Sequence, residues 1–337
     1  MGFPRLSSSR PSPHASRPTT APPQVSFVIP LYNCLALTRA CVASLQATLP
    51  AGLVHEIILV DDGSSDGTRE WLATLAQPFR VVLNERNLGY AAANNRGAAI
   101  AGGELLALLN NDLILAPRWL EPMLAAHHSL GGRAGLVGNV QLNADSGEVD
   151  HVGIIIDARG KPEHDRTPPS RLARLFAPVS RVPAVTAACV VLGRALWQQL
   201  GGFDQGYVNG GEDVDLCFRV RAAGRVNAVA LRSVVRHHVS SSVGRKLHDE
   251  ENSRRLAQRW RREFALAAAR RWCRDRFESI LLEPRDCEPA VARRVWFHAL
   301  GLTRTPPPEA IVALDASLDR EFARWREILP SSPGADS

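Results

Sequence analysis

Short apolar runs alternate with segments of helical periodicity in the N-terminal part of this 337-residue chain. The runs occupy residues 25–30, 57–60, 81–83 and 105–109, and the stretches between them are long enough for one helix each. Strands that alternate with helices at this spacing pair in parallel, because each helix carries the chain back across a face of the sheet. The sequence therefore predicts an α/β fold with a mainly parallel central sheet.

The composition changes along the chain and divides it into four parts. The first part is rich in Ser, Pro, Arg and Thr and has few apolar side chains, so burial cannot offset the entropy of ordering it. Beyond Gly244 the sequence is rich in arginine and predicts helices. We expect a disordered tail at 1–23, a sheet domain at 24–262, a helical C-terminal extension at 263–330 and a second disordered tail at 331–337.

Within the sheet domain, residues 141–183 are rich in charged residues, Pro and Gly, and only 152–156 are typical of a strand. We expect this segment to be a connecting excursion over the sheet. Regular structure should return with an apolar run at 185–192 and a helix at 195–200. A last amphipathic helix is expected at 311–329.

The overall composition excludes several classes of protein. With 45% hydrophobic and 22% charged residues, the chain is not disordered throughout. No apolar run approaches the roughly 18 residues of a membrane-spanning helix, and the N-terminus lacks the apolar region of a secretory signal. We therefore expect a cytoplasmic protein. The six cysteines form no CxxC pair, which argues against a disulfide scaffold or a structural zinc site.

The chain carries a formal net charge of +6, and all but two of its 40 basic residues are arginine. Such a charge favours anionic partners such as nucleotides, nucleic acids or acidic membrane surfaces. No basic stripe with interleaved aromatic residues occurs before residue 245, so we expect no nucleic-acid partner.

Polar side chains follow three of the four predicted strands. Ligands of open parallel sheets bind outside the carboxyl ends of the strands, so these residues are candidates for binding. Adjacent carboxylates there can accept hydrogen bonds from a ribose hydroxyl or a base N–H. The alternative is a turn that leads into a helix, with Ser65 or Asp66 as its cap. The candidates are Pro30, Tyr32 and Asn33 after the first strand, Asp61 and Asp62 after the second, and Asn110, Asn111 and Asp112 after the fourth.

Asp112 follows a strand that is apolar on both faces, so its carboxylate must leave the core or meet a cation. One or two carboxylates together with substrate phosphates commonly hold Mg²⁺ or Mn²⁺. Alternatively, Asp112 caps the next helix. The first predicted turn has no GxGxxG motif, which argues against a nicotinamide or flavin cofactor.

A second acidic cluster begins a predicted helix and contains Glu212, Asp213 and Asp215, preceded by two glycines. Acidic side chains stabilise a helix N-terminus, but three in four positions exceed what a cap needs. A carboxylate here could act as a general base toward a hydroxyl group. Further on, His237 and His238 end another apolar run, and one of them is a candidate contact for metal or phosphate.

In order and spacing, these residues resemble the successive motifs of family 2 glycosyltransferases. The likeness covers roughly residues 24–262. Its motifs are VSFVIPLYN (25–33), ILVDDGSSDGT (58–68), NLGYAAANNRGAAIAGGELLALLNND (87–112), GGFDQGYVNGGEDVDLCFRVRAAG (201–224) and HHVSSSVG (237–244).

The resemblance implies a GT-A fold, in which a nucleotide-binding sheet and an acceptor-binding part share one active centre. Asn-Asn-Asp stands where the family often has Asp-x-Asp, in a form similar to rhamnosyltransferase-like members. Asp112 and His237 would then hold a divalent cation, Mg²⁺ or Mn²⁺. The residues that match nucleotide-sugar contacts are Pro30, Tyr32, Asn33, Asp61, Asp62, Asn87, Gly89, Asn95, Asn110 and Asn111.

The activity implied is inverting transfer of a sugar, such as rhamnose or another hexose, from a nucleotide-diphosphate sugar to a glycan, lipid-linked or protein acceptor in cell-envelope polysaccharide biosynthesis. Asp213 matches the family's catalytic base, with Glu212 and Asp215 in support. A catalytically silent nucleotide-sugar-binding module is the alternative. A nucleotidyltransferase would usually carry a Gly-rich, basic loop after the first strand, where this chain has Leu31, Tyr32 and Asn33.

Two further expectations concern the acceptor. Residues 141–183 and 206–211 flank the acidic cluster and should border the acceptor pocket. The Arg-rich helix predicted at 250–282 could dock on the inner membrane leaflet or on a partner enzyme. Alternatively, its apolar residues simply pack on the sheet domain and leave the arginines in solvent.

Overall fold

The computed structural model describes residues 22–238, 248–282 and 287–329. The tails expected at 1–23 and 331–337 therefore lie outside the described residues, apart from positions 22 and 23.

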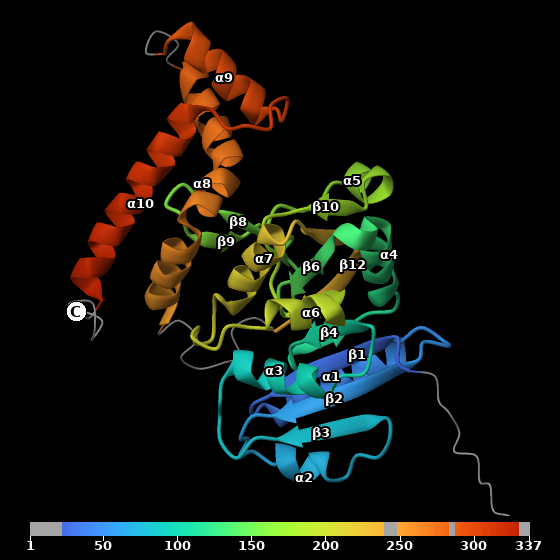
Figure 1. The fold of residues 1–337 in the computed structure, drawn as a ribbon. Coiled ribbons are helices and arrows are strands. Elements are labelled where there is room, and N and C mark those ends of the chain that lie inside the picture. The colour runs from blue at the N-terminus through green and yellow to red at the C-terminus, as the bar shows by residue number, and fades with distance from the viewer. Residues whose placement is uncertain (1–21, 239–247, 283–286, 330–337) are drawn as a thin grey trace, which may run out of the picture.

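The N-terminal half of the central sheet is parallel, as the sequence predicts. Its strands are β1 (Val25–Leu31), β2 (His55–Asp61), β3 (Phe79–Leu83) and β4 (Leu105–Leu109), in the spatial order β3-β2-β1-β4. Each neighbouring pair is parallel. Helices α1 (Leu35–Thr48), α2 (Thr68–Leu72) and α3 (Tyr90–Ile100) connect these strands (Figure 1).

The sheet continues beyond β4 through a strand of opposite direction. This strand, β11 (Cys189–Gly193), is antiparallel to both β4 and β6 (Ala134–Asn143). Next to β6 lies β12 (Val226–His237), which runs parallel to it, and β10 (Val179–Arg181) completes the edge. Short strand β5 (Leu113–Leu115) pairs with the end of β12. The longer strands other than β11 therefore share one direction, and β11, β10 and β5 run opposite to their neighbours.

The segment 141–183 contains more regular structure than the sequence predicts. The strand expected at 152–156 is β8 (Ile154–Ile156), which forms a hairpin with β9 (Pro162–His164). The segment also holds β7 (Val149–His151), paired with β6, strand β10, and helix α5 (Arg171–Phe176). These short elements have too few residues to show a periodic pattern in the sequence. Pairing with the longer strands β6 and β12 stabilises β7 and β10.

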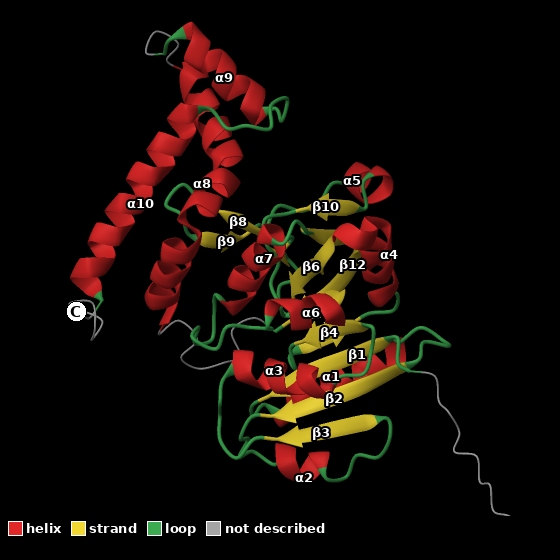
Figure 2. Cartoon of the chain, in the orientation of Figure 1, coloured by secondary structure: helices red, strands yellow, loops and turns green. Residues whose placement is uncertain are grey.

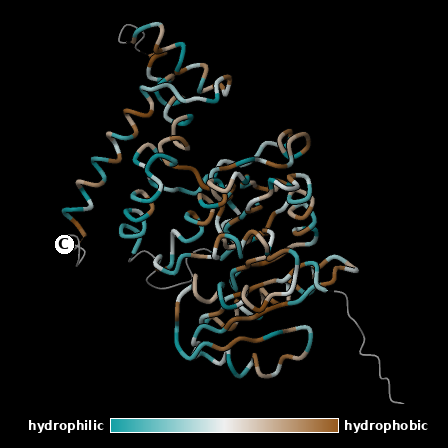
Figure 3. Tube along the Cα trace, viewed as in Figure 1, coloured by the Kyte–Doolittle hydropathy of each residue, from teal (hydrophilic) through white to brown (hydrophobic). Residues whose placement is uncertain are grey.

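Apolar side chains cover both faces of the sheet. Along β1, Phe27 and Ile29 belong to one buried cluster and Val28 belongs to the other. In Figure 3, stretches of hydrophobic residues run through the strands of the sheet. Helix α3 packs very closely, because a Cβ atom at Gly97 would lie 2.4 Å from Val28 Cγ1. The alanine-rich sequence of α3 suits this approach. Helices α4 (Leu120–Leu130), α6 (Arg194–Leu200) and α7 (Glu212–Ala222) complete the layers (Figure 2).

Three C-terminal helices form an arm on one side of the molecule (Figure 1). They are α8 (Asp249–Leu282), which is kinked at Trp260, α9 (Pro289–Ala299) and α10 (Pro308–Ile328). The first part of α8 packs on α7 and β8, and α9 and α10 pack on α8. The domain boundary expected at residue 262 falls inside α8, just after the kink. None of the helices within the described residues combines the length and apolar character needed to span a bilayer.

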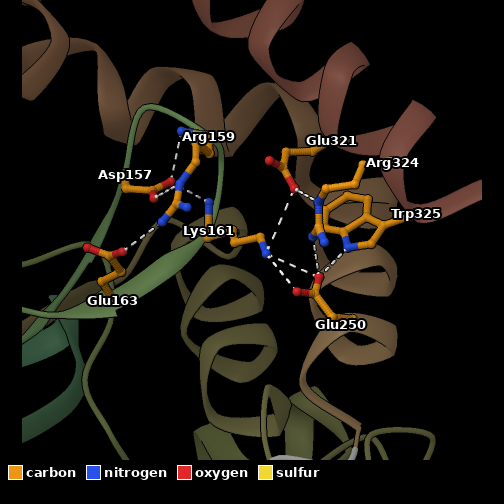
Figure 4. A network of polar contacts seen from close by, with 8 residues as sticks. All are labelled: Asp157, Arg159, Lys161, Glu163, Glu250, Glu321, Arg324 and Trp325. Carbon is orange, nitrogen blue, oxygen red and sulfur yellow. Dashed lines mark hydrogen bonds and ion pairs between the residues drawn. The ribbon is translucent and has the colours of Figure 1, made fainter. Parts of the chain in front are cut away.

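A polar network joins the arm to the β8–β9 hairpin (Figure 4). Glu250, at the start of α8, accepts hydrogen bonds from Lys161 Nζ at 3.1 Å and from Trp325 Nε1 at 2.6 Å. Arg324 also donates to Glu250 and to Glu321. The network thus fastens the end of α10 to both the hairpin and the first turn of α8.

This network makes stability depend on pH. Burial opposes ionisation of Glu250, but hydrogen bonds from Arg324, Trp325 and Lys161 outweigh it and lower the pKa of the carboxyl from 4.5 to about 2. A folded pKa below the unfolded one stabilises the fold above the unfolded pKa, and this contribution is lost as the pH falls toward 2. We expect Glu250→Gln to lower the free energy of unfolding by about 1 kcal/mol at neutral pH, as for a partly exposed ion-pair network.

Urea unfolding followed by circular dichroism between about pH 7 and pH 3 measures this effect. The difference between wild type and Glu250→Gln should shrink as the pH falls below 4.5. Glu278→Gln removes an exposed carboxylate of the same helix that forms no ion pair with described residues, and it should leave stability unchanged. A pH-independent loss in Glu250→Gln would contradict the electrostatic explanation.

Candidate active site

The turn after β1 is tied to the turn after β2. Asn33 has a positive φ of 55°, a conformation that asparagine tolerates better than most residues. Its backbone N–H donates to Ser64 Oγ at 2.8 Å, and its side-chain Oδ1 accepts from the Ser65 N–H at 2.8 Å. Tyr32 lies beside this junction with 51% of its surface exposed, whereas Pro30 is buried within β1. Tyr32 is therefore available to a ligand.

Asp61 is fully buried at the end of β2. Its carboxylate accepts a hydrogen bond from Arg69 Nε at 2.7 Å and one from the Ser64 N–H at 3.2 Å. Arg69 also donates to the carbonyl of Asn84. Asp61 therefore holds the turn after β2 and links it to the end of β3.

The carboxylate of Asp62 is buried and accepts hydrogen bonds from one side chain and two backbone N–H groups. Asn84 Nδ2 lies 2.6 Å from Oδ1, the Leu88 N–H donates at 3.0 Å, and the Gly89 N–H donates to Oδ2 at 2.9 Å. Sequence reasoning missed Asn84, although its position directly after the third apolar run was a usable signal. Asp62 thus shapes the loop that precedes α3.

The loop before α3 contains the predicted contacts Asn87 and Gly89. Asn87 Oδ1 accepts a hydrogen bond from the Gly89 N–H at 2.9 Å, and Gly89 has a φ of 91°. Asn95, inside α3, donates from Nδ2 to the Phe203 carbonyl at 2.9 Å and accepts from the Phe203 N–H at 2.9 Å. Both ends of the Asn95 amide thus fasten α3 to the loop at Phe203, and a contact of Asn95 with the nucleotide sugar stays a prediction.

Asp112 and His237 come together at the end of β12. His237 Nε2 lies 3.1 Å from Asp112 Oδ1, and His237 is only 4% exposed. Asn110 Nδ2 lies 3.5 Å from the same ring nitrogen. Among the described residues, Asn110 Oδ1 and His237 Nδ1 are buried without a hydrogen-bond partner. Asn111 instead donates to Thr38 Oγ1 at 2.9 Å.

The spacing of this pair fits a divalent cation. Two neighbouring ligands of an octahedral ion with bonds of about 2.1 Å are about 3 Å apart. The distance of 3.1 Å between Asp112 Oδ1 and His237 Nε2 matches this value. Within the described part of the chain, no group of three or more His, Cys, Asp or Glu side chains could hold a metal ion. Further ligands would have to come from elsewhere, such as phosphate oxygens.

The three acidic residues at the start of α7 have different environments. Asp215 is fully buried and binds Arg219 Nε at 2.7 Å and Trp260 Nε1 at 2.9 Å, which joins α7 to α8. Glu212 is 5% exposed and accepts from the Gly210 N–H at 2.8 Å. Asp213 is the most accessible of the three. Its environment therefore leaves it best placed to meet a substrate.

Residues 187 and 188 connect Asp213 to the rest of the site. The Ala187 N–H donates to Asp213 Oδ2 at 3.3 Å, and Tyr90 Oη donates to the Ala187 carbonyl at 3.1 Å. The Asn110 N–H donates to the Ala188 carbonyl at 2.8 Å. Burial raises the pKa of Tyr90, and the nearby charges of Glu212 and Asp213 raise it further. Sequence reasoning missed Tyr90. Its position directly after Gly89, a predicted binding residue, was a usable signal.

A second group missed by sequence reasoning lies on the 141–183 segment. Asp150 Oδ2 lies 3.6 Å from His164 Nδ1, and Arg166 lies 3.2 Å from the other oxygen of Asp150. The hydrogen bond to His164 lowers the pKa of Asp150, and His237 contributes to the same shift. Burial lowers the pKa of His151, which stacks edge-on against His164 at 4.7 Å. These residues therefore lie on the side of the site near His237.

Solved structures share this architecture. The chain superposes on the crystal structure of GalNAc-T7 with UDP, GalNAc and Mn²⁺, with a TM-score of 0.59 over 75% of this chain and 51% of that one, at 20% identity. It also superposes on the mannosyltransferase PcManGT from Pyrobaculum calidifontis in complex with GDP-Man and Mn²⁺, with a TM-score of 0.52 over 92% and 90% of the chains, at 18% identity. The fold is therefore that of the GT-A glycosyltransferases.

Sequence comparison identifies the family. Residues 26–186 match the model of glycosyl transferase family 2 and belong to that family. The uncharacterized protein y4gI of Sinorhizobium fredii is 34% identical over 76% of this chain and 28% of its own length. The O-antigen biosynthesis protein RfbC of Myxococcus xanthus is 31% identical over 67% of this chain and 18% of its own length. The chain thus spans less than a third of each of these relatives.

The link through Ala187 predicts a positioning role for Tyr90. We expect Tyr90→Phe to fold and to bind a nucleoside diphosphate as wild type does, while turnover falls about 3- to 10-fold, the worth of one hydrogen bond. The reason is that Ala187, and with it Asp213, loses a restraint. Steady-state release of nucleoside diphosphate separates kcat from the KM of the donor. A higher donor KM with normal kcat would contradict this role.

Proposed function

We propose that this chain is an inverting glycosyltransferase that uses a nucleotide-diphosphate sugar. The observation that carries the proposal is the convergence of two features on residues 187 and 188. One feature is the Asp112–His237 pair, whose neighbour Asn110 donates its backbone N–H to the Ala188 carbonyl. The other is Asp213, whose carboxylate accepts from the Ala187 N–H. Sugar transfer to a hydroxyl needs a group that stabilises the leaving diphosphate and a base for the hydroxyl proton. A cation on the Asp112–His237 pair would supply the first, and the carboxylate of Asp213 would supply the second.

The donor binds along the ends of β1, β2 and β4 in this proposal. Tyr32 is exposed there, and the loop at 87–89 is held by Asp62. The nucleoside would contact Tyr32 and the turns around Asp61 and Asp62, and the diphosphate would lie toward Asp112. UDP and GDP-Man in the solved structures named above support a nucleotide-sugar donor.

Asp112 and His237 would hold Mg²⁺ or Mn²⁺, with diphosphate oxygens as further ligands. A bound cation would stabilise the negative charge of the leaving diphosphate. The 3.1 Å spacing between Asp112 Oδ1 and His237 Nε2 supports this assignment. Mn²⁺ accompanies the nucleotide or nucleotide sugar in both solved structures.

Asp213 acts on the acceptor in the proposed reaction. Its carboxylate takes the proton of an acceptor hydroxyl, and the oxygen attacks the anomeric carbon of the donor sugar. The bond from that carbon to the diphosphate oxygen breaks on the opposite side, so a single displacement inverts the anomeric configuration. Hydrogen bonds from the Ala187 and Val214 N–H groups orient the carboxylate.

The acceptor side would be formed by the 141–183 segment and the loop at 206–211. Asp150, His164 and Arg166 give that segment polar groups that suit a sugar acceptor. The name of the O-antigen biosynthesis relative RfbC supports a polysaccharide acceptor. In this proposal the acceptor is a glycan or lipid-linked glycan of the cell envelope, used at the inner membrane face. The Asn-Asn-Asp motif at 110–112 supports a rhamnose or other hexose donor.

A catalytically silent binding module is the second candidate, because Asn110 stands where the family resemblance places the first carboxylate of Asp-x-Asp. It would bind donor without turnover. The accessible position of Asp213 between two buried acids favours the enzyme.

Asp213→Asn tests the proposal. The amide keeps an oxygen that can accept from Ala187 but removes the base, so turnover should fall by about 100-fold or more. Glu212→Gln should have a smaller effect. Nucleoside diphosphate release is measured with a panel of nucleotide sugars, with and without candidate acceptors.

Calorimetry provides the matched control. Binding of nucleoside diphosphate with Mn²⁺ should be nearly intact in Asp213→Asn and weakened in Asp112→Ala. Normal turnover in Asp213→Asn would assign the base to another group. Donor binding without turnover in the wild-type chain, across the whole panel and all acceptors, would favour the silent module.

A further inference from the structure

The first half of α8 is a packed element and not the docking face that the sequence suggested. Leu256 and Phe264 are buried against the sheet domain, as the alternative interpretation expected. Three arginines of this half pair with acidic side chains: Arg255 and Arg259 with Asp204, and Arg261 with Asp315 and Asp319. Their charge is therefore largely compensated inside the protein.

The far part of the arm has the opposite character. We call residues 266–282 and 287–305 the distal arm; they comprise the second half of α8, all of α9 and the turn that follows. Large apolar side chains are exposed here, most of all at the end of α8. They are Leu266 (43%), Leu281 (63%), Leu282 (83%), Trp296 (41%), Leu300 (57%) and Leu302 (69%).

Positive charge accompanies these apolar side chains. The distal arm has seven arginines and three acidic residues. Arg294 pairs with Glu309 of α10, but Arg271, Arg276, Arg293 and Arg304 form no ion pair with any residue that the structure describes. Among the described residues, the positive charge of the distal arm is therefore compensated less than that of the first half of α8.

We propose that the distal arm docks on an anionic membrane surface. Exposed leucines and a tryptophan beside arginines are the combination that binds the boundary between headgroups and acyl chains. Arginines near an anionic leaflet each contribute to binding, and together they attract the arm to the surface. This proposal deepens the proposed function, on which it rests, because it places the enzyme where a lipid-linked acceptor is found.

The shape of the arm favours a membrane over a protein partner. The distal arm is the narrow end of a helical hairpin that stands away from the sheet domain (Figure 1). A stable protein interface usually needs about 800 Å² of matched surface on each partner. A narrow, convex end offers less matched surface, whereas its side chains can enter a lipid headgroup layer without a complementary partner.

Co-sedimentation of the full chain with vesicles tests the proposal. Wild type should bind vesicles of phosphatidylglycerol and phosphatidylcholine but not vesicles of phosphatidylcholine alone, and binding should weaken as salt rises. The variant Arg271→Glu/Arg276→Glu/Arg293→Glu should lower binding by about 100-fold or more. Leu281→Ser/Leu282→Ser should weaken binding with little change in its salt dependence.

The matched control is Arg262→Glu/Arg320→Glu/Arg326→Glu, which makes the same change of charge at exposed positions outside the distal arm. It should retain most of the binding. Equal losses in the two triple variants, or negligible wild-type binding to both kinds of vesicle, would overturn the proposal. Concentration-dependent self-association of the chain would also overturn it, if Arg271→Glu/Arg276→Glu/Arg293→Glu abolished that self-association. The distal arm would then bind a second copy of the chain and not a membrane.

Donor binding separates this proposal from the proposed function. The distal variant should bind nucleoside diphosphate with Mn²⁺ as wild type does, since its changes lie outside the site. Failure of vesicle binding with intact turnover would remove only the docking surface. Failure of turnover with intact vesicle binding would remove only the enzymatic proposal.

Discussion

The site depends on the reversal of strand direction at β11. Because β11 runs antiparallel between β4 and β6, the residues just before it pass beside the end of β4. There Ala188 accepts from the Asn110 N–H, and Ala187 donates to Asp213. The backbone groups of Ala187 and Ala188 thereby fix Asp213 relative to the residues that follow β4. An all-parallel sheet would deliver this segment to the opposite edge.

The other polar residues support this frame in different ways. Asp61 and Asp62 use their carboxylates to fix loops, and Asp215 uses its own to bind α7 to α8. Such buried charges are tolerated because each has several donors. Asp213 keeps a partly accessible carboxylate, and Tyr32 is exposed. Asp61, Asp62 and Asp215 are therefore committed to holding the structure, whereas Asp213 can still meet a ligand.

The sequence predicted the features that local patterns encode. The four parallel strands follow from continuous apolar runs, and the positions of Asp112 and Asp213 follow from the rule that ligands lie at strand ends and helix starts. The short strands β7, β9 and β10 were missed because pairing, and not periodicity, stabilises them. The role of Tyr90 was missed because its partner, Ala187, is 97 residues away in sequence.

In the proposed reaction, Asp213 drives a single displacement at the anomeric carbon of the donor sugar. The stereochemistry of the product tests it most directly. Proton nuclear magnetic resonance of the first glycoside formed from a donor of known anomeric configuration gives the answer from the anomeric coupling constant. Single displacement predicts a product whose anomeric configuration is opposite to that of the donor. A product that retains the donor configuration would contradict single displacement and the role of Asp213 in it.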